Sequence, residues 1–224
     1  MRVKSKLIKA IIFDLDGTLI DSDKDIHEII NFIRSTHLNK KKININKIAN
    51  FSSIGGNDLI KETISKTKSK YYLKIFREIY IGKKIRNELI YPGVISFLKL
   101  LKSQKIKIFV CTNKPKYLTT KIIKNTVLTK YVNKIFCSDE YNATKPNKLF
   151  FEKISSKINT DKKHILYIGD SMVDYKFCIN CSLKFILFKN KRIEYPKKIY
   201  SELLKLDKVL FSFKNLRKLK NIIL

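Results

Sequence analysis

The sequence has little of what several protein classes require. It has no tryptophan and only four cysteines, four prolines and six glycines among its 224 residues. Four cysteines in a chain of this length do not make a disulfide framework, which serves small secreted domains with limited cores. No apolar run approaches the roughly 20 residues that a membrane-spanning helix needs. We therefore expect a cytoplasmic protein without signal peptide, membrane anchor or disulfide scaffold.

Acidic residues are also scarce, with 19 aspartates and glutamates against 48 lysines and arginines, which gives a net charge of +29. Such a charge is typical of a basic nucleic-acid-binding module, and this remains an alternative interpretation. However, lysine outnumbers arginine 42 to 6, whereas nucleic-acid recognition makes heavy use of arginine. Isoleucine and asparagine are abundant and alanine occurs three times, as A/T-rich coding DNA would produce. We therefore expect no nucleic-acid partner.

Apolar residues make up 44% of the chain and recur in periodic segments, as in a folded domain. Short runs rich in isoleucine predict parallel strands buried on both faces. Segments with apolar residues three and four positions apart predict helices between these runs. Strands that alternate with helices favour an α/β fold, a doubly wound Rossmann-like parallel sheet. The predicted strands are Leu7–Phe13, Ile106–Cys111, Ile135–Cys137, Ile165–Ile168, Phe185–Phe188 and Val209–Phe211.

One region interrupts the alternation. Between Ser22 and about Leu89 no strand pattern occurs, but apolar residues repeat at helical spacing. The Pro92-Gly93 pair marks the return to the sheet. The sequence therefore predicts an α/β catalytic core formed by residues 1–20 and 90–224, with a small helical cap domain, residues 21–89, inserted after the first strand.

The first predicted strand leads into the stretch FDLDGTLIDS, which carries Asp14 and Asp16. Residues two apart in a strand project to the same side, so both carboxylates should face the crevice beyond the strand end. Two carboxylates repel each other unless a cation lies near them, and hard oxygen ligands suit Mg²⁺. The simpler alternative is an aspartate-rich turn that closes a strand.

Three further polar stretches follow predicted strands. CTNKP places Thr112 at a strand end and Pro115 in the first turn of a helix, whose backbone amides suit phosphate. TKPNK places Lys145 in a loop, and YIGDSMVD places Asp170 and Asp174 one helical turn apart. Because the carboxyl ends of parallel strands meet at one edge of the sheet, we expect all four stretches to lie together.

The order of these stretches resembles the motifs of the haloacid dehalogenase superfamily, and most of all those of its phosphoglycolate phosphatase group. The stretches are FDLDGTLIDS, a helical insert, YPGV, TNKP, KP and GDSMVD. The resemblance covers nearly the whole chain. Two positions depart from the family pattern: Lys148 stands where a second proline is common, and Ser182 where a glycine usually follows the last helix of the motif. We expect these changes to alter loop rigidity at most.

This resemblance implies a Mg²⁺-dependent phosphatase that acts on a small phosphorylated metabolite, with phosphoglycolate as the first candidate. It implies that Asp14 is the nucleophile and forms an aspartyl-phosphate. It also implies that Asp16 acts as general acid and then as general base. The implied Mg²⁺ ligands are the Asp14 carboxylate, the Asp16 backbone carbonyl and Asp170, with Asp174 as a water-mediated or supporting ligand.

Further roles implied by the resemblance concern the phosphoryl group and the insert. Thr112 and Asn113 would hydrogen-bond the transferring phosphoryl group, and Lys145 would offset its charge. The segment SIGGNDLIK resembles the cap loop that faces the substrate, with Gly55 and Gly56 near the ligand and Lys61 available to a carboxylate or second phosphate. The alternative for this segment is an ordinary turn between helices.

Several other functions remain as alternatives. A phosphosugar mutase of the same superfamily, similar to β-phosphoglucomutase, tends to carry an extra acidic residue where this chain has Gly169. Dehalogenases lack the carboxylate that Asp16 supplies, and the intact acidic motifs argue against a catalytically silent interaction protein. Cys178 and Cys181 form a Cys-x-x-Cys pair, which is weak evidence for zinc without a second pair or nearby histidines.

Overall fold

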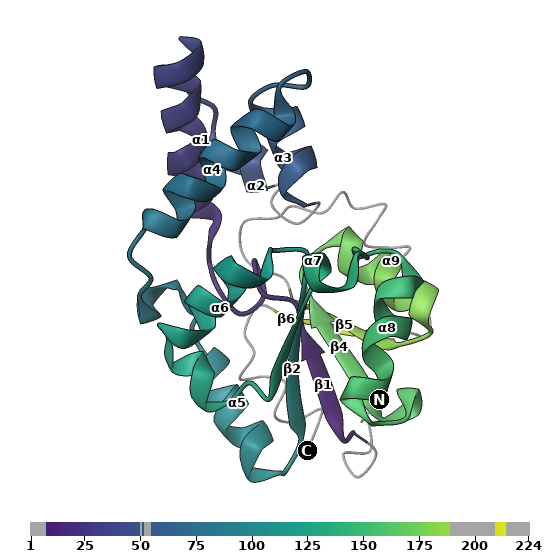
Figure 1. The fold of residues 1–224 in the computed structure, drawn as a ribbon. Helices are drawn as coiled ribbons and strands as arrows, with labels where there is room; N and C mark the ends of the chain where they lie inside the picture. The colour runs from purple at the N-terminus through teal and green to yellow at the C-terminus, as the bar shows by residue number, and fades with distance from the viewer. Residues whose placement is uncertain (1–7, 50, 52–54, 189–208, 214–224) are drawn as a thin grey trace.

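The computed structural model of the protein describes residues 8–49, 51, 55–188 and 209–213. Within these residues the strands form one parallel sheet of six in the order β3-β2-β1-β4-β5-β6, which confirms the predicted α/β class (Figure 1). Leu7, Ser53 and Ile54, which belonged to predicted segments, lie outside the described residues. The strands are β1 (Ala10–Phe13), β2 (Lys107–Thr112), β3 (Lys134–Cys137), β4 (Ile165–Gly169), β5 (Lys184–Phe188) and β6 (Val209–Phe213).

Helices follow the strands as the sequence periodicity predicts, and the described part of the chain adds short helices that the patterns did not reveal. None of the helices in this part of the chain combines the length and apolar character needed to cross a membrane. The α-helices are α1 (Asp23–Leu38), α2 (Ile45–Ala49), α3 (Gly56–Thr63), α4 (Ser69–Gly82), α5 (Val94–Ser103), α6 (Lys116–Lys124), α7 (Ser138–Tyr141), α8 (Lys148–Ile158) and α9 (Met172–Cys181). The 3₁₀ turns are η2 (Asn87–Leu89), η3 (Val127–Lys130) and η4 (Lys162–His164).

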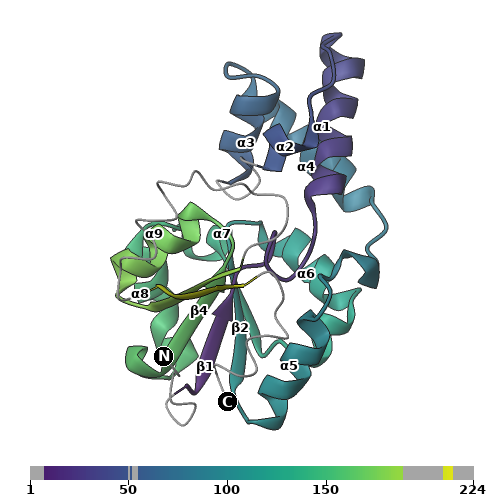
Figure 2. The same ribbon diagram turned by 180° about the vertical axis from the view of Figure 1, so that it is seen from behind.

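Both faces of the sheet are covered, as a doubly wound fold requires (Figures 1 and 2). Ile11 and Phe13 of β1 belong to one apolar cluster with α5 and α6. Ala10 and Ile12 belong to a second cluster with α8 and α9. This alternation follows from the period of two along a strand, and it explains why the run from Ala10 to Phe13 is apolar throughout.

Helices α1 to α4 lie apart from the sheet, beyond the carboxyl ends of its strands (Figure 1). Two chain segments connect them to the sheet and run antiparallel, with a bridge between Ile20 and Ile90. The Asp21 backbone N–H donates to Leu89, and the Tyr91 N–H donates to Leu19. The insert thus begins and ends at one paired connection, close to the predicted boundaries at residues 21 and 89, although its status as a separate domain stays a prediction.

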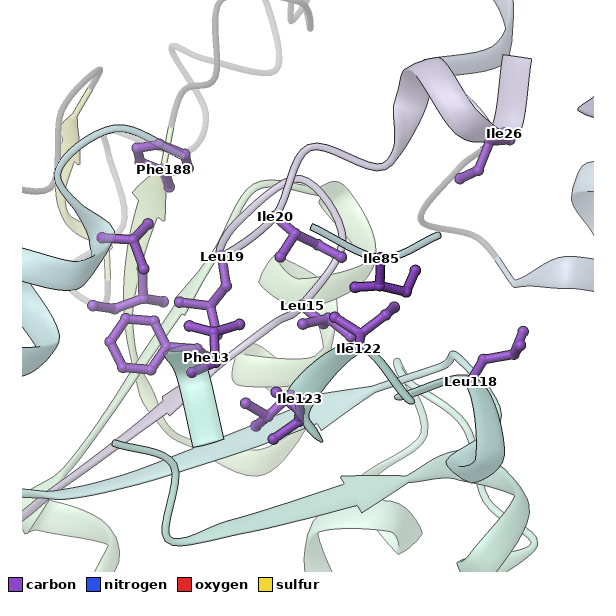
Figure 3. Packing of buried hydrophobic residues seen from close by; sticks show 14 of the residues in the cluster. Phe13, Leu15, Leu19, Ile20, Ile26, Ile85, Leu118, Ile122, Ile123 and Phe188 are labelled. Atoms are coloured by element: carbon purple, nitrogen blue, oxygen red, sulfur yellow. The ribbon is translucent and has the colours of Figure 1, made fainter. Parts of the chain in front are cut away.

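The loop after β1 is anchored by its own apolar side chains. Leu15 lies between the two aspartates in sequence and is fully buried, as are Leu19 and Ile20. All three pack in the cluster that contains Phe13 (Figure 3). Because apolar burial stabilises by about 25 cal/mol per Å², these side chains hold the loop rigidly at the edge of the sheet. Asp14 and Asp16 are therefore positioned by the core itself.

Candidate active site

Asp14 is the first residue after β1. Its backbone N–H donates to the Ile168 carbonyl of β4 at 2.9 Å, so the strand pairing continues up to the carboxylate. The side chain is buried, and its Oδ1 accepts a hydrogen bond of 2.7 Å from the Lys145 ammonium. Burial raises the pKa of Asp14 to about 7, against the lowering effect of Lys145 and with a further rise from Asp174.

Asp14, Asp170 and Asp174 form a cluster of three buried carboxylates. One oxygen from each lies within 4.8 Å of the others. Burial raises the pKa of Asp170 well above its ordinary value, and the charges of Asp14 and Asp174 add to this rise. Such a cluster is unfavourable unless positive charge lies close to it.

Lys145 supplies one such charge. Its ammonium donates to Asp14 and, at 2.6 Å, to Asp174. Burial lowers the pKa of Lys145, but the two carboxylates outweigh this effect, so its pKa lies above the ordinary value. Tyr167, in the middle of β4, accepts a bond from Lys145 at 3.1 Å and donates to Asp174 at 2.9 Å. The ammonium is therefore fixed between two acids and a phenol.

Asp174 also caps a helix, in addition to forming this ion pair. At the start of α9, the Ser171 hydroxyl accepts from the Asp174 N–H, while the Asp174 carboxylate accepts from the backbone N–H and hydroxyl of Ser171. This reciprocal arrangement is a capping box. Asp174 is thus held by the helix start and by Lys145, which leaves Asp170 as the more available carboxylate of this stretch.

Asp170 lies against the loop after β1. The Thr18 hydroxyl donates to its Oδ1 at 3.1 Å. Gly17 has a φ of +87°, and a Cβ at this position would lie 2.1 Å from Asp170 Oδ2. Only glycine lets the loop approach the carboxylate this closely, which is the physical reason for glycine in FDLDG.

Asp16 pairs with Lys114, a residue that the sequence analysis did not single out. The Lys114 ammonium donates to both carboxylate oxygens at 2.9 and 3.1 Å and lies 4.5 Å from the ring centre of Tyr80 on α4. Burial lowers the pKa of Lys114, but Asp16 outweighs this effect and the pKa is raised. Lys114 therefore joins the loop after β1 to a helix of the insert.

Thr112 and Asn113, the predicted phosphoryl contacts, lie at the end of β2 and line the same cavity as Asp14. The Thr112 hydroxyl accepts from the Lys114 N–H at 3.1 Å. The Asn113 amide donates to the Lys145 carbonyl, and its oxygen accepts from the Lys145 N–H. In this structure the Asn113 side chain thus positions Lys145, and its contact with a phosphoryl group stays a prediction.

The cavity beside these groups is lined by residues of the sheet edge and of the insert. Gly55 and Gly56 line it, and their contact with a substrate stays a prediction. Lys61 is not among the lining residues. Its side chain is exposed and pairs with Asp58 one turn earlier on α3, so the structure does not bring it to the site. Arg77 of α4 lines the cavity instead.

The donor set suits a divalent cation. Among the described residues, Asp14, Asp170 and Asp174 are the one group of acidic, histidine or cysteine side chains close enough to share a metal ion. Their hard oxygens match Mg²⁺, and three buried carboxylates beside one ammonium leave negative charge to be neutralised. Cys178 and Cys181 are buried free thiols on α9 outside this group, so the zinc alternative gains no support.

Three site residues were missed from the sequence: Lys114, Tyr167 and Arg77. Lys114 lies within the quoted TNKP stretch, but in a chain so rich in lysine it did not stand out. Tyr167 is a polar aromatic residue in an otherwise apolar strand that an aspartate follows directly, and this was a usable signal. Arg77 was the residue least indicated by the sequence. Helical periodicity shows which face of a helix packs against a neighbour, but it does not show which residues line a cavity.

The chain matches the family model "Haloacid dehalogenase-like hydrolase" over residues 11–188. It is 29% identical to a phosphoglycolate phosphatase of Rhodobacter capsulatus over 185 residues, which cover 80% of this chain and 83% of that protein. It is 27% identical to a phosphoglycolate phosphatase of Aquifex aeolicus over 167 residues, which cover 75% and 78%. The crystal structure of a predicted phosphoglycolate phosphatase from Haemophilus somnus shares the fold, with a TM-score of 0.82, 22% identity and coverage of 97% and 99%.

Proposed function

Because the chain belongs to the haloacid dehalogenase-like hydrolases, we propose that it is a Mg²⁺-dependent phosphatase whose first candidate substrate is phosphoglycolate. The enzyme class, a phosphatase, follows from the family and from its phosphoglycolate phosphatase relatives. The metal, the substrate and the roles of single residues are the proposal. The observation that supports it most is the cluster of Asp14, Asp170 and Asp174 beside Lys145 at the carboxyl ends of the strands.

In this proposal Asp14 attacks the phosphorus of a phosphate monoester. A bond forms between the Asp14 oxygen and phosphorus, the bond from phosphorus to the ester oxygen breaks, and Asp16 gives its proton to the departing oxygen. Water then attacks the phosphorus of the aspartyl-phosphate and loses its proton to Asp16, and the bond to Asp14 breaks. Both carboxylates line the cavity where these atoms must meet.

The surrounding residues reduce the cost of bringing two negative groups together. Lys145 lies within hydrogen-bond distance of Asp14, where it offsets the charge of the nucleophile and of the phosphoryl group in the transition state. Thr112 offers a hydroxyl at the cavity wall. Carboxylates of Asp14 and Asp170, with the Asp16 backbone carbonyl, would hold Mg²⁺. The bound ion supplies further positive charge for the phosphoryl oxygens.

A specific contact disfavours the mutase alternative. Gly169 occupies the place where such mutases carry an acidic residue, and a Cβ there would lie 2.6 Å from the Cβ and Cγ of Asp174. A carboxylate at position 169 would therefore displace Asp174 from its helix cap and from Lys145. The absence of a nucleic-acid partner and the cytoplasmic location stay predictions.

The proposal is tested by a phosphate-release screen over phosphorylated metabolites with Mg²⁺. We expect small substrates to be preferred and Asp14→Asn to lose activity at least about a thousandfold, since removing a catalytic group costs that much or more. Asp161→Asn is the matched control, because Asp161 is exposed and precedes β4 at the opposite edge of the sheet. Activity that survives Asp14→Asn would remove Asp14 from the nucleophile's role.

A further inference from the structure

Arg77 is a cation at the cavity wall, and the proposed mechanism assigns it no role. It lies on α4, is half-buried, and lines the same cavity as Asp14 and Lys145. Within the described part of the chain its guanidinium makes no hydrogen bond and no ion pair, whereas Lys114 on the same cavity wall is paired with Asp16. The Arg77 guanidinium thus has no counter-ion in a cavity where the proposed substrate is an anion.

The position of Arg77 separates it from the reacting groups. Asp14, Thr112 and Lys145 reach the cavity from the sheet, and Arg77 reaches it from the insert. Apolar side chains of Leu59, Leu73 and Phe76 line the cavity around the insert helices. A ligand whose phosphoryl group lies at Asp14 would therefore meet apolar surface and, at the insert, one unpaired guanidinium.

The chemistry of the cavity restricts what Arg77 can bind. A guanidinium presents parallel N–H donors that match the two oxygens of a carboxylate. Phosphoglycolate, the first candidate substrate, carries such a carboxylate at the end opposite its phosphoryl group. Lys61, the residue expected to fill this role, is exposed and paired with Asp58.

We infer that Arg77 determines specificity by pairing with the carboxylate of a short carboxylated phosphate ester. The inference rests on the proposed phosphatase function and names the residue of this chain that selects the carboxylate. Arg77 also lines a second groove, here called the outer groove, together with Lys74, Glu78 and Tyr117.

The test compares phosphoglycolate with its amide, which has nearly the same size but no carboxylate charge. For the wild-type protein with Mg²⁺ we expect kcat/KM to favour the carboxylate by about 10- to 100-fold, the range for hydrogen bonds to charged groups. Arg77→Gln should remove that preference and leave kcat/KM for the amide nearly unchanged. Arg77→Lys, which keeps the charge but not the paired donors, should fall between the two.

Lys74→Gln is the matched control, because Lys74 is exposed on the same helix and lines only the outer groove. It should retain the preference for the carboxylate. Equal losses of kcat/KM on both esters in Arg77→Gln, or a wild-type protein that does not discriminate between the esters, would overturn the inference.

p-Nitrophenyl phosphate separates the two proposals. If it is hydrolysed while phosphoglycolate is not preferred, the phosphatase stands and the carboxylate subsite fails. If no ester is hydrolysed, both fail.

Discussion

Among individual residues, Lys114 has an unusual set of contacts. It holds both oxygens of Asp16, lies over the ring of Tyr80 and is nearly buried. In the proposed mechanism Asp16 delivers a proton to one oxygen and later takes one from water, so the placement of its carboxylate matters. Lys114 would then be a positioning residue that fixes this carboxylate relative to the insert.

We predict that Lys114→Met lowers kcat about 100-fold, the cost of displacing a reacting group by about 1 Å. KM should change little, because the phosphoryl group and the carboxylate of the substrate bind elsewhere. Steady-state kinetics on phosphoglycolate separate the two constants. Lys116→Met is the control, since Lys116 is exposed and pairs with Glu140 on the surface. An effect on KM alone, or an equal loss in the control, would contradict the prediction.

Residue types explain why the first set of site residues was predictable and the second was not. Asp14, Asp16 and Asp170 follow buried strands in a chain with few acids, so their position carried information. Lys114 is one of 42 lysines, so only three-dimensional packing distinguishes it from solvated ones. Arg77 is one of only six arginines, but nothing in the sequence shows that its helix lines the cavity.

Among the helices and strands, α9 shows how a departure from the family pattern acts on stability. Its C-cap is Ser182, with φ 55° and ψ 39°, in the left-handed region. Glycine adopts this conformation without strain, whereas a residue with a Cβ pays about 1–2 kcal/mol. The expected effect on local rigidity stays a prediction, while the left-handed backbone of Ser182 gives a reason to expect an effect on stability.

We predict that Ser182→Gly raises the free energy of unfolding by about 0.5–1 kcal/mol, the relief of strain less the added freedom of the unfolded chain. Denaturant unfolding measures this change. Ser155→Gly, within α8, is the control and should lower stability by a similar amount, because glycine is unfavourable in a helix interior. A loss of stability in Ser182→Gly would contradict the prediction, because the Ser182 side chain would then stabilise the fold by more than its backbone strain costs.

The element pattern of the core was largely predictable because buried parallel strands read as continuous apolar runs. The run at Ile165–Ile168 matches β4, which ends at Gly169, and the run at Phe185–Phe188 matches β5. Strand order was not predictable, because neighbouring strands β1 and β4 are separated by most of the chain. Helix α7 was also missed, since four residues are too few to show a period.

For the molecule as a whole, the proposed metal site would link folding to activity. Asp170 is buried beside two other carboxylates, so without a cation its charge lowers the stability of the folded protein. A ligand that binds only the folded state raises stability in proportion to the logarithm of its concentration. Mg²⁺ should therefore stabilise the whole chain and not only order the site.

We predict that Mg²⁺ at about a hundred times its dissociation constant raises the thermal midpoint by about 5–10 °C, from a stabilisation of about 2.7 kcal/mol. Asp170→Asn should show no such shift, while its metal-free midpoint equals or exceeds that of the wild-type protein. Differential scanning calorimetry measures both values, with KCl of matched ionic strength as the salt control. Equal shifts in the two proteins would place the ion elsewhere.

The net charge of +29 also acts over the whole molecule. Exposed lysines attract small anions over a Debye length of about 8 Å at physiological salt. This field suits an enzyme with a phosphorylated substrate, and a nucleic-acid partner is not required to explain it. The lysines of the site, Lys114 and Lys145, differ from paired surface lysines such as Lys61 because they and their carboxylate partners are nearly buried.

The proposed covalent step on Asp14 can be tested directly. Wild-type protein mixed with phosphoglycolate and Mg²⁺, quenched in acid during turnover and digested, should yield the peptide that contains Asp14 with the added mass of one phosphoryl group. The same peptide from Asp14→Asn should carry none. Turnover without any phosphorylated peptide, or with the phosphoryl group on another residue, would contradict a nucleophilic role for Asp14.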